Sequence, residues 1–182
     1  MENSLQKVKE GIEAQPFAKL MGFEAEEAGE GYAVISCRRR DDLLQQTGMM
    51  HGGVTGALCE AAGGYAALTV LPEGQSLIGV EYKINFLRGI TMDKAVAKAH
   101  VIKRGRQLIV VEVDACNEGS DKLAAKMIMT GRRHRGDFPE EPEERWRRES
   151  WRRPTATLSA CAAAVTIVTI AFNEMITRKR GA

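Results

Sequence analysis

The stretch that most constrains this 182-residue chain is a run of small and apolar residues over 54–71. It follows a polar loop that ends in His-Gly-Gly at 51–53, and one carboxylate, Glu60, interrupts its first half. A helix composed mostly of Ala, Gly and Leu must be buried, because little of its surface can face water. A lone Glu on such a helix is costly to desolvate unless it has a partner or a function. The run therefore predicts a central buried helix whose single acid needs an explanation.

The segments on either side predict a sheet that packs on this helix. Apolar spacing predicts a first amphipathic helix over 4–21, which Gly22 ends. Two strands are expected within 23–40 around a glycine turn, the second over 32–37. After Pro72 and Gly74 stop the central helix, alternating and β-branched patterns predict four more strands over 78–86, 95–103, 108–115 and 123–129. Strands joined by short turns are typically antiparallel, so we expect an α+β domain over 1–133.

Composition limits the class of partner. The formal net charge of +2 is close to neutral and does not favour a nucleic-acid partner. The four cysteines are widely spaced without a Cys-x-x-Cys pair, so we expect neither a zinc site nor a disulfide framework. The polar residues 1–11 do not resemble a signal peptide. These features favour a cytoplasmic protein with no metal ion and no bound redox cofactor.

Residues 134–182 differ in character from the rest. The segment 134–155 is rich in Pro, Glu and Arg and predicts a solvated linker or a charged helix. Its interleaved glutamates favour a solvated face over nucleic-acid or anionic membrane contact by Trp146 and Trp151. Residues 156–172 carry no charge, and a basic segment follows within 156–182. A spanning helix usually needs about 20 apolar residues. We therefore favour a helix on a partner subunit, or a loosely ordered tail, over a membrane anchor.

The start of the central helix carries the chemistry. Gly52 and Gly53 supply amides to its first turn, where unpaired N–H groups and the helix dipole stabilise a developing oxyanion. Glu60 lies eight residues after Gly52, or about 12 Å along a helix. One carbonyl cannot contact both groups of one helix, so a shared site requires two antiparallel helices, as a two-fold dimer provides. The alternatives are a plain loop-to-helix turn at the glycines and a Glu60 paired with a core Lys, Arg or Tyr.

Gln45, the His-Gly-Gly triplet and Glu60, at their spacing, resemble the hotdog-fold acyl-CoA thioesterases of the PaaI type. Residues 84–88 and 105–106 are similar to that family's next two strands, and the resemblance covers residues 15–131. It implies a sheet wrapped round a long helix, a homodimer often doubled to a homotetramer, and hydrolysis at the dimer interface. Gly52 then matches the amide donor to the thioester oxygen, and Glu60 the carboxylate that attacks the thioester or activates water. Gln45 matches a residue that places water or substrate, and His51 a histidine that shapes the loop.

The chain also departs from the family pattern. Many members carry Asp at the position of Glu60, and the Glu makes this chain more similar to the Arthrobacter-type hydroxybenzoyl-CoA branch. That branch has a Thr one turn later, where this chain has Gly64. The chain therefore lacks a hydroxyl that would help to position water beside the carboxylate. Gly53 lets a substrate approach the backbone closely. Four basic residues are either ligands of the CoA phosphates or solvated strand ends: Arg88, Lys103, Arg104 and Arg106.

The remaining candidates carry less chemistry. Cys59 is expected to be a buried thiol rather than a nucleophile, because successive helical residues point in different directions. His100 and His134 are given no function. We therefore expect an acyl-CoA thioesterase for which CoA is part of the substrate and no separate cofactor is needed. The alternative is a non-catalytic acyl-CoA-binding hotdog domain tethered through its C-terminal tail.

Overall fold

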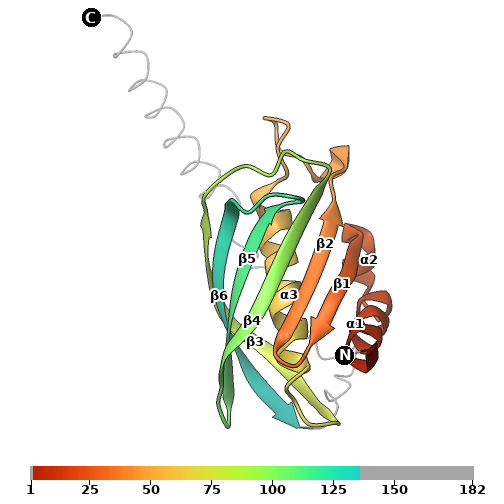
Figure 1. Ribbon diagram of the computed structural model, residues 1–182, viewed down its shortest axis with the longest axis vertical. Coiled ribbons are helices and arrows are strands. Elements are labelled where there is room, and N and C mark those ends of the chain that lie inside the picture. The colour runs from red at the N-terminus through yellow and green to blue at the C-terminus, as the bar shows by residue number, and fades with distance from the viewer. Residues whose placement is uncertain (1, 136–182) are drawn as a thin grey trace, which may run out of the picture. The chain divides into compact units, whose positions relative to one another are not determined.

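The computed structural model describes residues 2–135, which form three helices, a short 3-10 turn and six strands (Figure 1). In chain order these are α1 (Glu2–Ala14), α2 (Pro16–Met21), β1 (Phe23–Gly29), β2 (Tyr32–Arg38), η1 (Asp41–Leu43), α3 (Gly52–Leu68), β3 (Gln75–Phe86), β4 (Lys94–Arg104), β5 (Leu108–Asn117) and β6 (Leu123–Arg135). The predicted linker over 134–155, except for its first two residues, and the predicted tail over 156–182 lie outside the described residues. Within 2–135, no helix is long and apolar enough to cross a bilayer.

The prediction of one N-terminal helix over 4–21 is wrong. Gln15 separates α1 from α2 with an extended backbone, at φ −91° and ψ 114°. Proline disfavours the helical conformation in the residue before it and lacks an N–H to continue the hydrogen-bond ladder, so Pro16 starts a new helix. Gly22 ends α2 at φ 70°, in the left-handed region that glycine adopts without strain.

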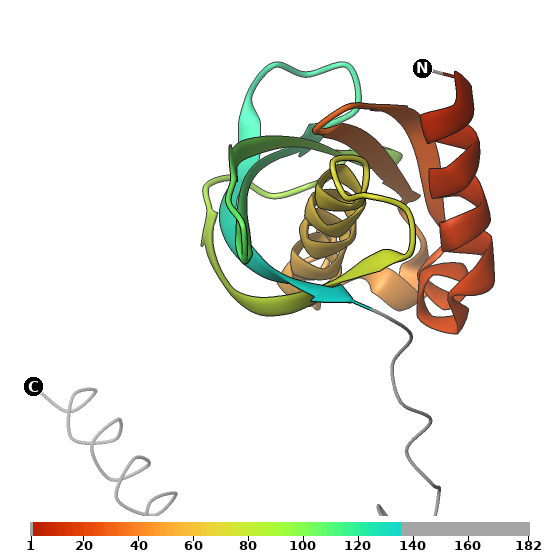
Figure 2. The ribbon, with the colours of Figure 1, turned by 90° about the horizontal axis from the view of Figure 1, so that it is seen from below.

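The six strands form one antiparallel sheet in the order β1-β2-β4-β5-β6-β3, which confirms the predicted α+β architecture. The sheet curves around α3, which Figure 2 shows inside the curve with α1 and α2 outside β1. The crossover through α3 carries the chain to the far edge, where β3 pairs with β6. β6 continues to Arg135, beyond the predicted end, because it has a strand partner there: Gln75 of β3 lies opposite Arg135.

Small side chains let α3 approach the sheet closely. On β4, Ala95, Ala97 and Ala99 face the helix and are completely buried, as is Leu58 on the helix itself. Gly63 of α3 has no room for a Cβ, which would collide with Met129 of β6. Because the core is packed this closely, the stability of the fold is sensitive to any change in side-chain volume there.

The prediction that α3 is buried on all sides is wrong, because one side of the helix is exposed in the single chain. The helix also ends at Leu68 rather than near Leu71. Gly53, Glu60 and Leu68 are exposed in the single chain, whereas the face toward the sheet is buried. The sheet covers only part of the helix circumference, and nothing within residues 2–135 covers the rest. The acid of the apolar helix lies on this open side.

Replacing Leu58 with Ala tests the core. The side chain is completely buried, so we expect a loss of about 2–5 kcal/mol in the free energy of unfolding, measured by urea denaturation at fixed protein concentration. Ile102→Ala is the control, because 53% of Ile102 is exposed on β4; it should change stability by less than about 0.5 kcal/mol. Equal losses in the two variants would contradict this packing.

Candidate active site

The first turn of α3 presents one free backbone donor. His51 is the N-cap residue, and its Nδ1 accepts a hydrogen bond of 2.9 Å from the N–H of Gly53. The loop is held in place by the His51 N–H, which donates to the Leu43 carbonyl at 2.9 Å. Within residues 2–135 the N–H of Gly52 has no hydrogen-bond partner. The histidine therefore satisfies one amide and leaves the Gly52 amide available at the positive end of the helix dipole.

A cleft of about 430 Å³ opens at this end of the helix, and Gln45, Gly52, Phe86 and Arg88 are among its lining residues. The Phe86 ring packs on Gly52, where an added Cβ would lie 3.4 Å from Cζ. Gln45 donates through Nε2 to Thr47 Oγ1 at 2.9 Å, and Arg88 donates to the Leu123 carbonyl at 2.8 Å. The structure thus groups three of the predicted residues, Gln45, Gly52 and Arg88, around the free amide.

Glu60 lines a different cleft, of about 450 Å³, between α3 and β3. Gly53 and Ala57 lie on its helix side, and Glu81 and Tyr82 come from β3. A smaller hollow of about 130 Å³ continues along α3 past Gly64, Leu68 and Leu77. Glu60 borders both spaces, so its carboxylate is positioned to contact a ligand in either one.

The Glu60 carboxylate has no hydrogen bond or ion pair within residues 2–135, so the core Lys, Arg or Tyr partner considered above is absent there. Although the residue is partly exposed, burial of the carboxyl between helix and strand raises its pKa above the usual value. Tyr65 is buried, and burial, followed by the charge of Glu60, raises the pKa of its phenol to about 12. A carboxylate with a raised pKa on an apolar wall is a stronger base than an ordinary surface Glu.

Three residues beside Glu60 were missed by the sequence analysis: Gln15, Tyr65 and Gly79. Gln15 reaches this hollow because the helix is interrupted between α1 and α2. Pro16 is the sequence signal from which this interruption could have been predicted. A Cβ on Gly79 would lie 3.8 Å from Glu60 Oε1, and the ladder to β6 shifts register between Gly79 and Glu81. Bulges of this kind re-aim side chains next to functional sites.

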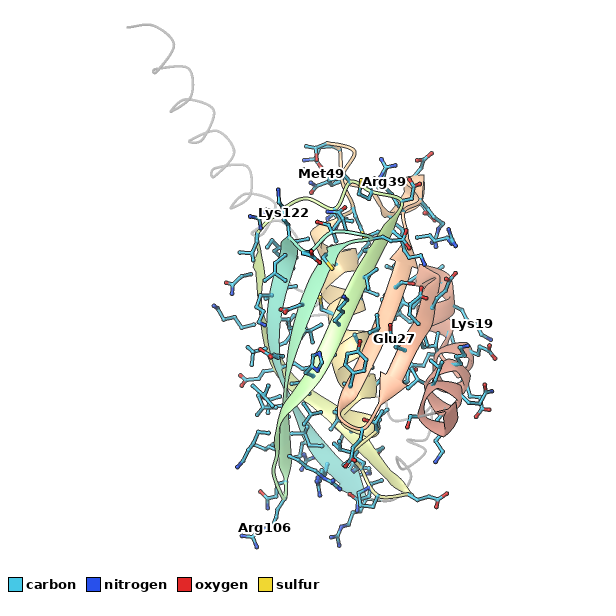
Figure 3. The ribbon with its side chains drawn as sticks, viewed as in Figure 1. Lys19, Glu27, Arg39, Met49, Arg106 and Lys122 are labelled. Carbon is cyan, nitrogen blue, oxygen red and sulfur yellow. The ribbon has the colours of Figure 1, made fainter. Side chains whose placement is uncertain are left out.

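The basic residues predicted to bind CoA phosphates do not form one cluster. Arg88 lies at the N-terminal end of α3, whereas Arg104 and Arg106 lie at the far end of the sheet, where Figure 3 labels Arg106 opposite Met49. Arg104 is paired with Glu30 at 3.7 Å. Cys59 is completely buried, and burial raises the pKa of its thiol to about 12, as expected for an inert core cysteine. No group of acids, cysteines and histidines within residues 2–135 is suited to hold a metal ion.

Comparisons with known proteins agree with this arrangement. The family model of the thioesterase superfamily matches residues 47–124. A Saccharolobus solfataricus protein provisionally named as an esterase is 30% identical over 127 residues, which cover 70% of this chain and 83% of that protein. The acyl-coenzyme A thioesterase 13 of Pongo abelii is 26% identical over 129 residues, which cover 69% of this chain and 91% of that protein.

A solved structure extends the agreement to the fold. The PaaI protein from the phenylacetic acid degradation operon of E. coli matches with a TM-score of 0.67 at 24% identity, covering 74% of this chain and 96% of that one. The chain therefore belongs to the thioesterase superfamily, and its sheet curved around α3 is the hotdog fold.

Proposed function

We propose that this protein hydrolyses an acyl-CoA thioester to the free acid and CoA at a site shared by two subunits. The observation that carries the proposal is the separation of two complementary half-sites on one helix. The free Gly52 amide and the Glu60 carboxylate open into different clefts, about 12 Å apart along α3. A two-fold dimer with antiparallel α3 helices places Gly52 of each subunit beside Glu60 of the partner subunit.

Such a site contains the parts that thioester hydrolysis needs. The thioester oxygen accepts a hydrogen bond from the Gly52 N–H, which stabilises the oxyanion that develops as the carbonyl carbon is attacked. Glu60 either takes a proton from the attacking water or attacks the carbonyl carbon itself, forming an anhydride that water then cleaves. In the first route the C–S bond breaks as the proton taken up by Glu60 passes to the sulfur of CoA. In the second route the C–S bond breaks as the anhydride forms, CoA leaves as the thiolate, and the water that then cleaves the anhydride supplies the proton that makes the thiol. Gln45, beside Gly52, is placed to orient the water or the substrate.

Symmetry singles out another residue of α3. If positions 52 and 60 exchange across a two-fold axis, position 56 lies midway and faces its own copy. This residue is Gly56, which is buried in the single chain, although a Cβ placed there would have no atom within 4 Å other than nearby backbone of the helix. The absence of a side chain at this point leaves space for a second helix to approach.

A non-catalytic acyl-CoA-binding domain is the second candidate. It is favoured by Gly64, which lines the hollow beside Glu60 and offers no hydroxyl to position water. The superfamily membership and the name of the Pongo abelii relative support the hydrolase. Acyl-CoA binding without thiol release would favour the second candidate.

The direct test replaces Glu60 with Gln. Loss of the carboxylate should lower kcat for acyl-CoA hydrolysis by about 10²–10⁴-fold, because Gln can neither take a proton nor attack the thioester. Thiol release, followed with a thiol-reactive dye, measures the rate. Glu81→Gln is the matched control, since Glu81 lines the same cleft and should leave turnover close to that of the wild type. Unchanged turnover in the Glu60 variant would contradict the mechanism.

A mixing experiment tests the sharing of the site. Gly52→Pro removes the amide donor, and the helix tolerates it because Gly52 is the first residue of α3 and His51 is already extended, at φ −63° and ψ 139°. Gly52→Pro and Glu60→Gln should each be inactive alone. Subunits of the two variants, refolded together, should recover about one quarter of wild-type activity, since half of the dimers are mixed and each has one intact site.

Gly52→Ala keeps the amide and is the control for the proline variant. A site formed within one subunit predicts no recovery on mixing, and that result would exclude the shared arrangement. The mixed sample must contain dimers, which sedimentation establishes before the activity is read.

The raised pKa of Glu60 predicts a trade between stability and activity. Burial disfavours the charged carboxylate in the folded state, so folding loses stability as the pH rises through the raised pKa. Glu60→Gln should therefore unfold at a higher urea concentration than the wild type at pH 7.5. The advantage should disappear below the ordinary Glu value, where both side chains are neutral. A Glu60 variant less stable at pH 7.5 would contradict this account.

A further inference from the structure

Beyond the last core residues of β6, arginines occupy positions that elsewhere on the strand face the helix. Alternation along the strand puts these residues on one face: Met127, Met129, Gly131, Arg133 and Arg135. Leu77 closes the core over Gly131, where an added Cβ would lie 2.7 Å from Leu77 Cγ. Two guanidinium groups therefore follow directly on the side of the strand that forms the core.

A hollow of about 380 Å³ lies at this end of the sheet. Four arginines and two neutral amides line it: Arg106, Arg132, Arg133, Arg135, Gln75 and Gln107. Arg106 belongs to the turn between β4 and β5, at the end of the molecule opposite Met49 (Figure 3). The turn is attached to β6 by the Arg133 N–H, which donates to the Gln107 carbonyl at 2.9 Å. No acid is among the residues that line this hollow.

Within residues 2–135, these arginines lack the counter-charges that other basic residues have. Among the ion pairs within residues 2–135, none includes any of the four. By contrast, Lys94 and Lys126 each contact two acids. Nε of Arg133 is buried and has no hydrogen-bond partner in the described part of the chain. The positive charges of neighbouring guanidinium groups repel one another, and a buried donor without a partner costs free energy. An anion bound in the hollow would reduce the repulsion and supply an acceptor for the unpaired N–H.

We propose that this hollow binds a ligand with adjacent phosphate groups. Guanidinium groups match the geometry of phosphate oxygens and bind them in pairs. Four of them, with two amide side chains, supply more donors than one carboxylate can accept. The size of the hollow falls within the range of ordinary ligand sites.

Two kinds of ligand contain adjacent phosphate groups. One is the nucleotide end of CoA, which has a diphosphate and a 3′-phosphate, and the other is a separate nucleotide or polyphosphate. Gln75 precedes Gly79, the residue beside Glu60, by four positions, so the hollow lies about 13 Å along β3 from the level of the carboxylate. The pantetheine arm of CoA spans such a distance. The assignment to CoA rests on the proposed function, whereas phosphate binding does not.

The test titrates the full-length protein with inorganic diphosphate by calorimetry. Arg133→Gln/Arg135→Gln should raise Kd about tenfold or more, because each lost guanidinium removes charge-assisted hydrogen bonds. Added NaCl should also raise the Kd of the wild type for diphosphate, because salt screens the attraction between the arginines and the anion. Arg38→Gln/Lys98→Gln removes the same charge from exposed positions on β2 and β4 and should bind like the wild type. If the first variant fails to fold by circular dichroism, Arg106→Gln/Arg132→Gln replaces it.

Kinetics then separate the two sources. A higher KM for an acyl-CoA, with an unchanged KM for the pantetheine thioester of the same acid, assigns the hollow to CoA. Unchanged KM values for both thioesters, with diphosphate binding lost, assign it to a separate phosphorylated ligand. Absence of diphosphate binding by the wild type, or equal Kd values in all variants, overturns the proposal. A wild type that hydrolyses neither thioester refutes the proposed function but leaves the calorimetric result decisive.

Discussion

The packing of α3 on the inner face of the sheet is the contact on which the other features depend. Alanines on β4 and Gly63 on the helix bring the two backbones close, and the buried side chains leave little space between them. A sheet that curves this tightly still leaves one side of a helix uncovered. Because Glu60 lies on that side, the same packing that stabilises the fold also determines which cleft receives the carboxylate.

The two groups of the proposed site, the Gly52 amide and the Glu60 carboxylate, are positioned by different local features. The donor depends on the loop before α3, where the imidazole of His51 takes the second amide and leaves the first one free. The acid depends on burial partway along the helix, where helix and strand surround a carboxyl that has no internal partner in the described chain. The separation of the two groups along one helix follows from 3.6-residue geometry, which puts eight residues about 12 Å apart.

Much of this fold could be predicted where local patterns decide the structure. The β-branched run of β5 and the glycine turn at Gly31, with φ 71°, gave elements close to those observed. The break at Gln15 could have been inferred from Pro16. The extension of β6 to Arg135 could not, because an arginine-rich segment has no apolar pattern and becomes a strand only through its partner β3.

The candidate residues could be selected from the sequence, but their arrangement could not. The spacing of Gln45, Gly52 and Glu60 made these three residues candidates, and the helical rise showed that Gly52 and Glu60 of one helix could not contact the same carbonyl. No pattern showed that Glu60 would face an opening, since an apolar helix looks the same on every side in sequence. The separation of Arg88 from Arg106 could have been inferred, because the two residues precede and follow β4 and therefore lie at opposite ends of that strand.

The position of β3 at the edge of the sheet has a consequence for handling the protein. β3 is twelve residues long, pairs on one side with β6, and exposes Val80, Tyr82 and Phe86. An edge strand with apolar side chains and unpaired backbone groups is a template for non-native strand addition and aggregation. Within residues 2–135 no strand pairs with the outer side of β3. Loss of solubility at high protein concentration is therefore the outcome that an uncovered β3 edge favours.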